Sequence, residues 1–386
     1  IICCRIIGGR EKGGVRLESE VLLYGYGAVC LSMMMFNIFY SLSLKQSDKR
    51  LAQIRGRFRR RISKELSVLK QGKEIDPKHL QYLRRRLCHS RYLIAFDQAL
   101  KECTEFEETF VMEEYSRQIQ TVFLHLAIIY AGKEDMEAAY FAYFVSQHKS
   151  RRIRPVDVIQ NMMVEYMKRN FYCRVNALQA LCQFGSEENV VKAISVLDWE
   201  GNFLHEKILT EGLMSFSGSH ARLTSLLWEK LESFSQKMQL AILNYIRFKS
   251  GDYCQWMLLI LENSRKDKEL RLCAIRYFGK YFYEPARSLL LQFARNRDPL
   301  YWEYAAISIT SLASYQGEAV IEVLVDAVHS SNWYVRYNAA VSLKAHQLSY
   351  TELAQVTGGH DRYAREMLMY QLERKRMEQK EWGAVS

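Results

Sequence analysis

A small or apolar residue recurs about every 32 residues through the second half of this 386-residue chain. Each copy lies in a segment with helical spacing of apolar residues, and a second apolar position follows four residues later on the same face. A fixed period of this kind is typical of stacked helical hairpins. The first series is Ala177, Leu209, Ala241, Cys273, Ala305 and Ala339, and the second is Leu181, Leu213, Tyr245, Tyr277, Ile309 and Leu343.

The paired alanines Ala339 and Ala340 stand where leucine would bury more surface. Stacked hairpins bring backbones close together, and a leucine there would overpack the layer at a cost of about 1–3 kcal/mol. Arg336 lies beside these alanines, and Arg174 lies at the matching place in an earlier repeat. We expect both arginines to reach the loop of a neighbouring repeat.

A second periodic series marks the turn inside each repeat. A glycine directly after a helix often takes the left-handed conformation that ends the helix. We therefore predict a unit of helix, glycine turn, helix and short loop. The turn positions are Gly185, Gly218, Gly251 and Gly317, with Glu284 in the remaining slot, and the helices that follow repeat Leu227, Leu259, Leu291 and Val323.

Three stretches resemble HEAT-like repeats, in particular the short kind grouped with phycobilin-lyase repeats. They are Asn332–Leu343, Asp298-Pro299 before the helix at 301–309, and the run from Arg174 to Ala177. The resemblance covers about residues 171–350 and implies an α-solenoid. The period is shorter than that of typical HEAT units, and the turn aspartate is an asparagine at position 332.

The fold class that we predict is all-α, an α-solenoid of HEAT-like hairpins preceded by one transmembrane helix. Long segments with helical periodicity and few strand-like alternations support it. The predicted divisions are a short extracytoplasmic tail (1–20), a transmembrane helix (21–44), a basic juxtamembrane stalk (45–64), degenerate hairpins (65–170), the HEAT-like repeats (171–350) and C-terminal capping helices (351–386).

Residues 21–44 carry no charge. At about 1.5 Å per residue they extend about 36 Å, which is enough to cross a hydrocarbon core of about 30 Å. Tyr24, Tyr26 and Tyr40 lie near the ends, where interfacial aromatic residues are common. A buried soluble helix and a signal peptide are the alternatives, but the run is longer than a signal-peptide core of about 7–15 residues. We therefore expect a retained anchor.

Basic residues follow the apolar run directly. Residues 45–64 hold nine lysines and arginines against one acid, Asp48, whereas residues 1–20 hold four against three. The positive-inside rule then predicts a single-pass protein of the inner (cytoplasmic) membrane, with its N-terminus outside and the solenoid in the cytoplasm. We expect anionic lipid headgroups to contact the basic run. The membrane-surface residues predicted here are Arg55, Arg57, Arg59, Arg60 and Arg61.

Signatures of catalysis are scarce in this sequence. It contains no HExxH, no Walker loop, no GxSxG and no zinc-spaced Cys/His set, so we predict no catalytic residue, no metal and no cofactor. The pair His205-Glu206 is similar to one found in helical-repeat hydroxylases, which need several such pairs. Cys88-His89 lacks an orienting partner, and the nine cysteines show no disulfide framework.

An aromatic and basic group is the candidate binding surface. Trp302, Trp333, Tyr334 and Arg336 could line a partner or ligand surface, although such residues are more often core. The formal net charge of +11 lies mainly in the run at 45–64, which argues against a nucleic-acid partner.

The function predicted from these features is that of a scaffold or adaptor, not an enzyme. It would bind a protein partner at the cytoplasmic face of a bacterial membrane, such as a membrane glycosyltransferase. The alternative is a HEAT-like enzyme or ligand-handling module, because HEAT-like folds include bilin lyases and alkylpurine DNA glycosylases. The oligomeric state is open.

Overall fold

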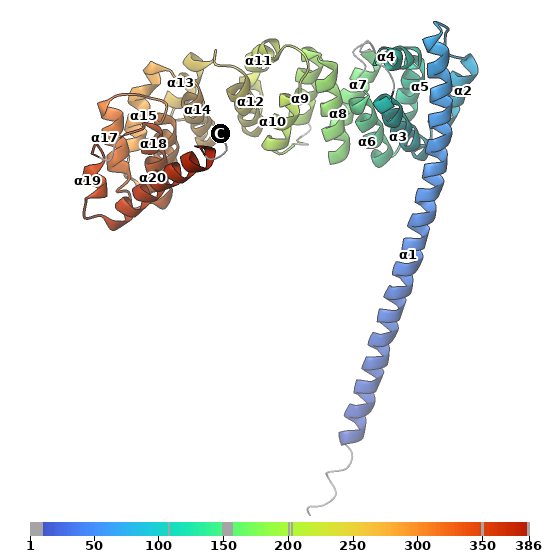
Figure 1. The fold of residues 1–386 in the computed structure, drawn as a ribbon, viewed down its shortest axis with the longest axis horizontal. Helices are drawn as coiled ribbons and strands as arrows, with labels where there is room; N and C mark the ends of the chain where they lie inside the picture. Colours follow the sequence, from blue (N-terminus) through green and yellow to red (C-terminus); the bar gives the residue numbers. More distant parts are fainter. Residues whose placement is uncertain are drawn as a thin grey trace, which may run out of the picture. The chain divides into compact units, whose positions relative to one another are not determined.

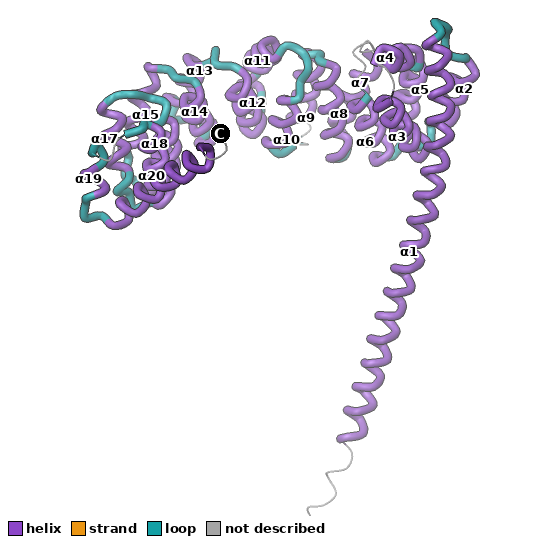
Figure 2. The backbone as a smooth tube through the Cα atoms, in the orientation of Figure 1, coloured by secondary structure: helices purple, strands orange, loops and turns teal. Residues whose placement is uncertain are grey.

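The structure, a computed structural model, describes residues 11–106, 109–148, 157–199, 201, 204–348 and 351–383. Within these ranges the chain is all-helical, with 20 α-helices and no strand (Figure 2). The predicted all-α class is therefore confirmed. The predicted tail at 1–20 falls partly outside the described residues, and its last ten residues already belong to a helix.

The chain forms two compact units, and the first contains helices α1 to α5. Helix α1 buries only its C-terminal part: Phe58, Ile62 and Leu66, spaced by four residues, are fully buried. This stripe packs against α3 and α4, and the ring of Phe58 lies 5.5 Å from that of Phe96. The helices are α1 (Glu11–Lys70), α2 (Pro77–Arg86), α3 (Ser90–Phe106), α4 (Thr109–Gln118) and α5 (Gln120–Ala131).

The apolar side chains that the structure describes between residues 24 and 44 of α1 are exposed. In Figure 1 this segment of α1 extends away from α2–α5 as one unbroken helix. The exposed fractions of Phe36 and Phe39 are 68% and 70%, and those of Tyr24 and Tyr40 are 76% and 56%. The uncharged segment of α1 is thus exposed, whereas its basic C-terminal segment buries one apolar stripe against the first unit.

The second unit contains α6 to α20 in two rows. Helices α6, α8, α10, α12, α14, α16, α18 and α20 pack on one another in that order, and we call them the first row. We call the alternate helices, from α7 to α19, the second row. Among them, α7 contacts α9, α9 contacts α11, and α15 contacts α17. Each second-row helix follows a first-row helix along the chain (Figure 1). The first-row bounds are α6 (Asp135–Gln147), α8 (Phe171–Phe184), α10 (Glu206–Met214), α12 (Gln236–Lys249), α14 (Lys268–Lys280), α16 (Trp302–Leu312), α18 (Trp333–Ala345) and α20 (Arg362–Gly383).

The remaining helices of this unit are shorter on average. They are α7 (Asp157–Glu165), α9 (Glu187–Trp199), α11 (His220–Glu229), α13 (Cys254–Glu262), α15 (Arg287–Arg295), α17 (Glu318–Ala327) and α19 (Ala354–Thr357).

Both periodic series lie in the first row and are buried. Every one of the twelve residues is at most 1% exposed. Side chains of neighbouring first-row helices also reach across the stack: the amide of Asn338 donates to the carbonyl of Ala306 (3.0 Å), and that of Asn176 donates to the carbonyl of Ala139 (2.9 Å). Ser342 donates in the same way to Ile309 (2.9 Å).

Several first-row helices begin with a capping side chain and carry an arginine four residues after it. Asn332 accepts from the backbone amides of Tyr334 and Val335, while Arg336 donates to the carbonyl of Ser330 at 3.1 Å. Arg336 therefore ties down the loop before its own helix, whereas we expected it to reach a neighbouring repeat. The Asp361–Arg365 pair has the same geometry, with Arg365 donating to Gly359 at 3.0 Å.

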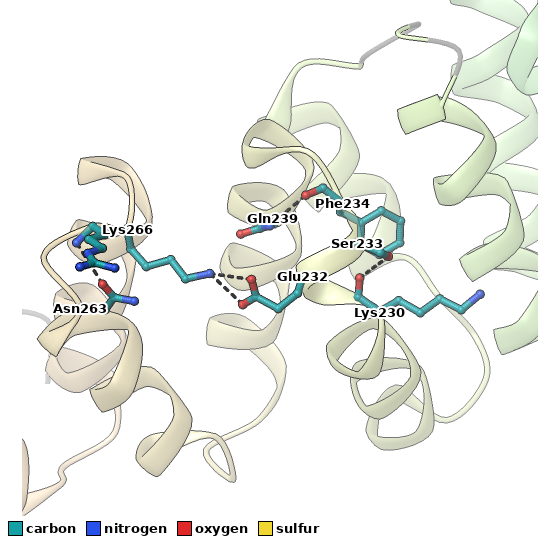
Figure 3. Close-up of polar contacts among 8 residues, drawn as sticks. Lys230, Glu232, Ser233, Phe234, Gln239, Asn263 and Lys266 are labelled. Atoms are coloured by element: carbon teal, nitrogen blue, oxygen red, sulfur yellow. Dashed lines mark hydrogen bonds and ion pairs between the residues drawn. The ribbon is translucent and has the colours of Figure 1, made fainter.

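Helix α12 has a glutamine where these helices have arginine. Gln239 donates to the carbonyl of Phe234 at 2.9 Å, and Glu232 of the same loop pairs with Lys266 of the next loop at 2.7 Å (Figure 3). A contact between these two loops thus links consecutive helical hairpins, and a side chain of α12 secures the loop before it.

The turn glycines are required for different structural reasons, positive φ at some positions and close backbone approach at others. Gly185 is left-handed (φ +72°) and caps the end of α8, as the helix-ending role predicts. Gly317 also has positive φ (+123°), but it is the N-cap of α17 and does not end α16, so the predicted role is wrong there. Gly218 does not have positive φ: a Cβ there would lie 2.5 Å from the carbonyl oxygen of Gly185. Close approach of consecutive turns, and not backbone handedness, requires this glycine.

The predicted leucine series of the second-row helices is only partly buried. Leu227 and Val323 are buried, but Leu259 is 58% exposed. Helix α13 instead buries the adjacent Ile260 and Leu261, and α15 buries Leu290. Helices α13 and α15 thus turn an apolar residue adjacent to the predicted one toward the core.

Candidate partner-binding groove

Three successive first-row helices, α10, α12 and α14, form an open groove with a cavity volume of about 710 Å³. Its apolar side chains include Met214, Leu240 and the partly exposed Phe248. Charged side chains of both signs surround them. The lining is completed by His205, Glu206, Lys207, Thr210, Glu211, Asn244, Arg247, Glu269 and Arg276.

Arg247 and Arg276 come from adjacent helices, α12 and α14. Their positions follow from the burial of their neighbours: Ile246 and Tyr277 are fully buried, which leaves each arginine at the edge of the core. The guanidinium carbon of Arg247 lies 4.8 Å from the ring centroid of Phe248. Its Nε atom is buried and has no hydrogen-bond partner. Because this Nε–H is sealed from solvent, an anionic ligand group would have to bind the other nitrogens of the half-buried guanidinium.

The local electrostatics also favour an anion between the two arginines. Burial lowers the pKa of the Arg247 guanidinium, and the positive charge of Arg276 adds to this effect. Cys273 of α14 is fully buried, its thiol donates to Oδ1 of the lining residue Asn244 at 3.6 Å, and burial raises the pKa of the thiol to about 11. The thiol is therefore protonated at neutral pH and unsuited to nucleophilic chemistry.

Three carboxylates also line the groove, those of Glu206, Glu211 and Glu269. Within the described residues, neither arginine forms an ion pair with any of them. A groove with separate positive and negative groups beside apolar side chains suits a peptide segment of mixed charge better than a uniformly charged polymer. Sequence analysis missed Arg247 and Arg276, because only their burial distinguishes them from the other basic residues.

The two residue pairs considered for chemistry have structural roles. His205 caps α10, with its Nδ1 accepting from the backbone amide of Lys207 at 3.3 Å. Cys88 donates its thiol hydrogen to the carbonyl of Arg84 at 2.9 Å. No group of three or more potential metal-ligating side chains occurs in the described part of the chain.

The structure brings the predicted aromatic group together at the starts of α16 and α18. Trp302 stacks with Tyr334 (5.3 Å between ring centroids), and Trp333 meets Tyr334 edge to face (5.2 Å). The exposed fractions of Trp333 and Tyr334 are 51% and 56%, so half of each ring remains accessible. Arg336 instead packs over Tyr363, 5.3 Å from its ring centroid, and is half-buried.

The five predicted membrane-surface arginines differ in their contacts. Arg55 and Arg59 both pair with Glu102, at 3.1 and 3.8 Å. Arg61 lies over the ring of Tyr82, 4.1 Å from its centroid. Arg57 and Arg60 are exposed. Two of the five are therefore partly neutralised inside the first unit.

By length and composition, α1 is a candidate membrane span. It is the one helix among the described residues that is long and apolar enough to cross a bilayer, and its apolar window has no buried residue. No protein-family model matches the chain, and no curated protein is found as a relative.

Proposed function

We propose that this chain is a membrane-tethered adaptor, in which two rows of helices form a HEAT-like solenoid that binds a partner protein. The observation that carries the proposal is that α1 has an exposed apolar part and a part that packs into the first unit. Its apolar half is exposed over residues 24–44, and the same helix continues without a break into the buried stripe at Phe58, Ile62 and Leu66.

Insertion of the apolar half into a bilayer removes this exposed surface from water. Burial of apolar surface contributes about 25 cal/mol per Å², so a helix face of this kind is strongly unfavourable in solution. The basic residues that follow support a cytoplasmic location of the folded units under the positive-inside rule. A rigid helical connection would hold the adaptor close to the membrane.

The groove on α10, α12 and α14 is the proposed partner site. Its features favour a segment that places a carboxylate between Arg247 and Arg276 and an apolar side chain against Phe248. That the partner is a glycosyltransferase stays a prediction.

Site-specific photocrosslinking in cells tests the proposal. A photoreactive amino acid at Phe248 samples the groove, and the same residue at Trp256 on α13 provides a matched control, because both side chains are 46% exposed. We expect position 248 to yield a discrete adduct with a membrane protein and position 256 to yield none. Arg247→Met should reduce the adduct at position 248.

Two results would contradict the proposal. One is an equal pattern of adducts at both positions, which would indicate nonspecific collision. The other is release of the unmodified chain from membranes by alkaline carbonate, which would show that α1 does not span the bilayer.

A further inference from the structure

The uncharged run at 21–44 contains one side-chain amide, that of Asn37. Asn37 lies seven residues before Leu44, about 10.5 Å along the helix from the end of the run. Its side chain is exposed and has no hydrogen-bond partner within the described residues. An amide carries two N–H donors and an oxygen acceptor, and the hydrocarbon core of a bilayer satisfies neither. In a membrane, Asn37 therefore needs a polar partner from outside its own helix.

The serines of the same run do not create this need. A serine hydroxyl in a helix can donate to a carbonyl of the preceding turn of its own helix, which satisfies its one donor. Ser32, Ser41 and Ser43 can therefore enter a bilayer without a second helix. Asn37 is thus the residue of this run whose chemistry calls for an association.

Asn37 lies on a stripe of α1 with heptad spacing. Residues separated by alternating steps of three and four share one helix face and form the seam of a left-handed helix pair. All members of the stripe are at least partly exposed, and the apolar window of α1 has no buried residue. Three of them are small, which lets two backbones approach closely. We name the stripe the asparagine seam: Gly27, Cys30, Met34, Asn37, Ser41 and Leu44.

The opposite face of α1 has the same spacing and also contains three small residues, but it has no amide. Small residues alone therefore do not distinguish the two faces, whereas the hydrogen-bonding requirement of Asn37 does. A single polar residue of this kind in a seam fixes register and partner. The opposite face consists of Gly25, Ala28, Ser32, Met35 and Phe39.

A second copy of the chain has the surface that matches this seam. The basic run at 45–64 gives every copy the same orientation under the positive-inside rule, so two α1 helices lie parallel and residues of equal number meet at a twofold axis. Two Asn37 amides then satisfy each other, because each is both donor and acceptor. We propose that α1 forms a parallel homodimer in the bilayer through the asparagine seam. This proposal rests on the membrane anchoring proposed above.

Oxidative crosslinking of the full chain in membranes tests which face pairs. Copper phenanthroline joins two Cys30 thiols when the seams of two copies are in contact. The matched control combines Cys30→Ser with Ser32→Cys, which moves the thiol by two residues and about 200° around the helix at nearly the same depth. Both positions are exposed. Serine first replaces the cysteines that are partly buried or lie before residue 11: Cys3, Cys4, Cys88 and Cys254.

We expect Cys30 to give a species of twice the chain mass that contains two differently tagged copies. The control thiol should give much less of it. Equal crosslinking at the two positions, or no crosslink at Cys30, would overturn the proposal. A crosslink of Cys30 only to a different membrane protein would also overturn it and would assign the seam to that protein.

Energy transfer between labelled copies of the full chain in lipid vesicles measures the contribution of the amide. Asn37→Leu should weaken association by about 3- to 30-fold, the range that interhelical hydrogen bonds of polar side chains supply in membranes. Ser32→Leu is the matched polar-to-leucine change on the opposite face and should leave association unchanged. An equal effect of the two substitutions, or none of Asn37→Leu, would contradict the seam.

Carbonate extraction of the unmodified chain provides the separate test of anchoring. A chain that resists extraction but shows no energy transfer between copies would refute the homodimer alone. An extractable chain would refute the anchor on which the homodimer depends.

Discussion

The side-chain amide of Asn338 donates to the backbone carbonyl of Ala306, one repeat earlier, at 3.0 Å. Asn176 makes the equivalent bond to Ala139 at 2.9 Å. Both asparagines precede an alanine of the buried series by one residue, Ala339 and Ala177. The small residue permits the backbones to approach, and the asparagine beside it joins them.

Replacement of Asn338 by alanine should lower the free energy of unfolding by about 0.5–1.5 kcal/mol, because one hydrogen bond between repeats is lost. Denaturant unfolding of the full chain in non-ionic detergent measures the change. Asn263→Ala is the control, since its side chain is exposed and accepts only from the nearby amide of Arg265. Equal effects of the two substitutions would contradict a stacking role for Asn338.

Gly218→Ala should destabilise the second unit by about 1–3 kcal/mol, because the new Cβ would meet the carbonyl oxygen of Gly185 at 2.5 Å and the ring of Phe216. Thermal unfolding reports the change. Gly132→Ala is the matched case: its nearest atom would be 3.9 Å away, so its melting temperature should stay within a degree or two of the unmodified chain. A tolerated Gly218→Ala would show that consecutive turns do not approach so closely.

His79 gives the first unit a stability that depends on pH. The side chain is buried, and its Nε2 lies 2.9 Å from the hydroxyl of Tyr115. Burial, aided by the charge of Arg61, lowers the pKa of His79 from 6.5 to about 4. The unfolded chain therefore takes up a proton first as pH falls. The contribution is fully present above pH 6.5 and is lost as pH falls toward 4, by roughly 3 kcal/mol in total.

Denaturant midpoints at several pH values between 7 and 4 measure this loss, and His79→Gln isolates it from the carboxylates. We expect the free energy of unfolding to fall less steeply with acid in the variant than in the unmodified chain. Identical slopes would mean that His79 does not stay neutral in the folded protein.

Phe36→Arg should impair membrane insertion. The ring of Phe36 is 68% exposed within the apolar half of α1, and an arginine at the centre of a spanning helix costs about 2.5–3.5 kcal/mol. The fraction of chain that resists alkaline carbonate should fall accordingly. Phe110→Arg serves as the control, because that ring is 65% exposed but lies on α4, and it should leave the fraction unchanged.

The sequence by itself determined the helical class and the positions that carry the stack. Ala177, Ala241 and Leu343 could be identified because a helix buries residues at regular spacing and a repeat returns them at a regular interval. Composition alone was enough to identify the uncharged run at residues 21–44. The residues of the aromatic group could also be named, since aromatic side chains are few and conspicuous.

Only the tertiary structure decided which charged residues act together. Sequence spacing placed Arg336 beside a neighbouring repeat, but its guanidinium instead donates to the carbonyl of Ser330, in the loop before its own helix. Arg247 and Arg276 are 29 residues apart in the sequence but line the same groove. Long polar side chains have no period that reveals their partners, because their surroundings depend on how neighbouring helices rotate and where loops turn.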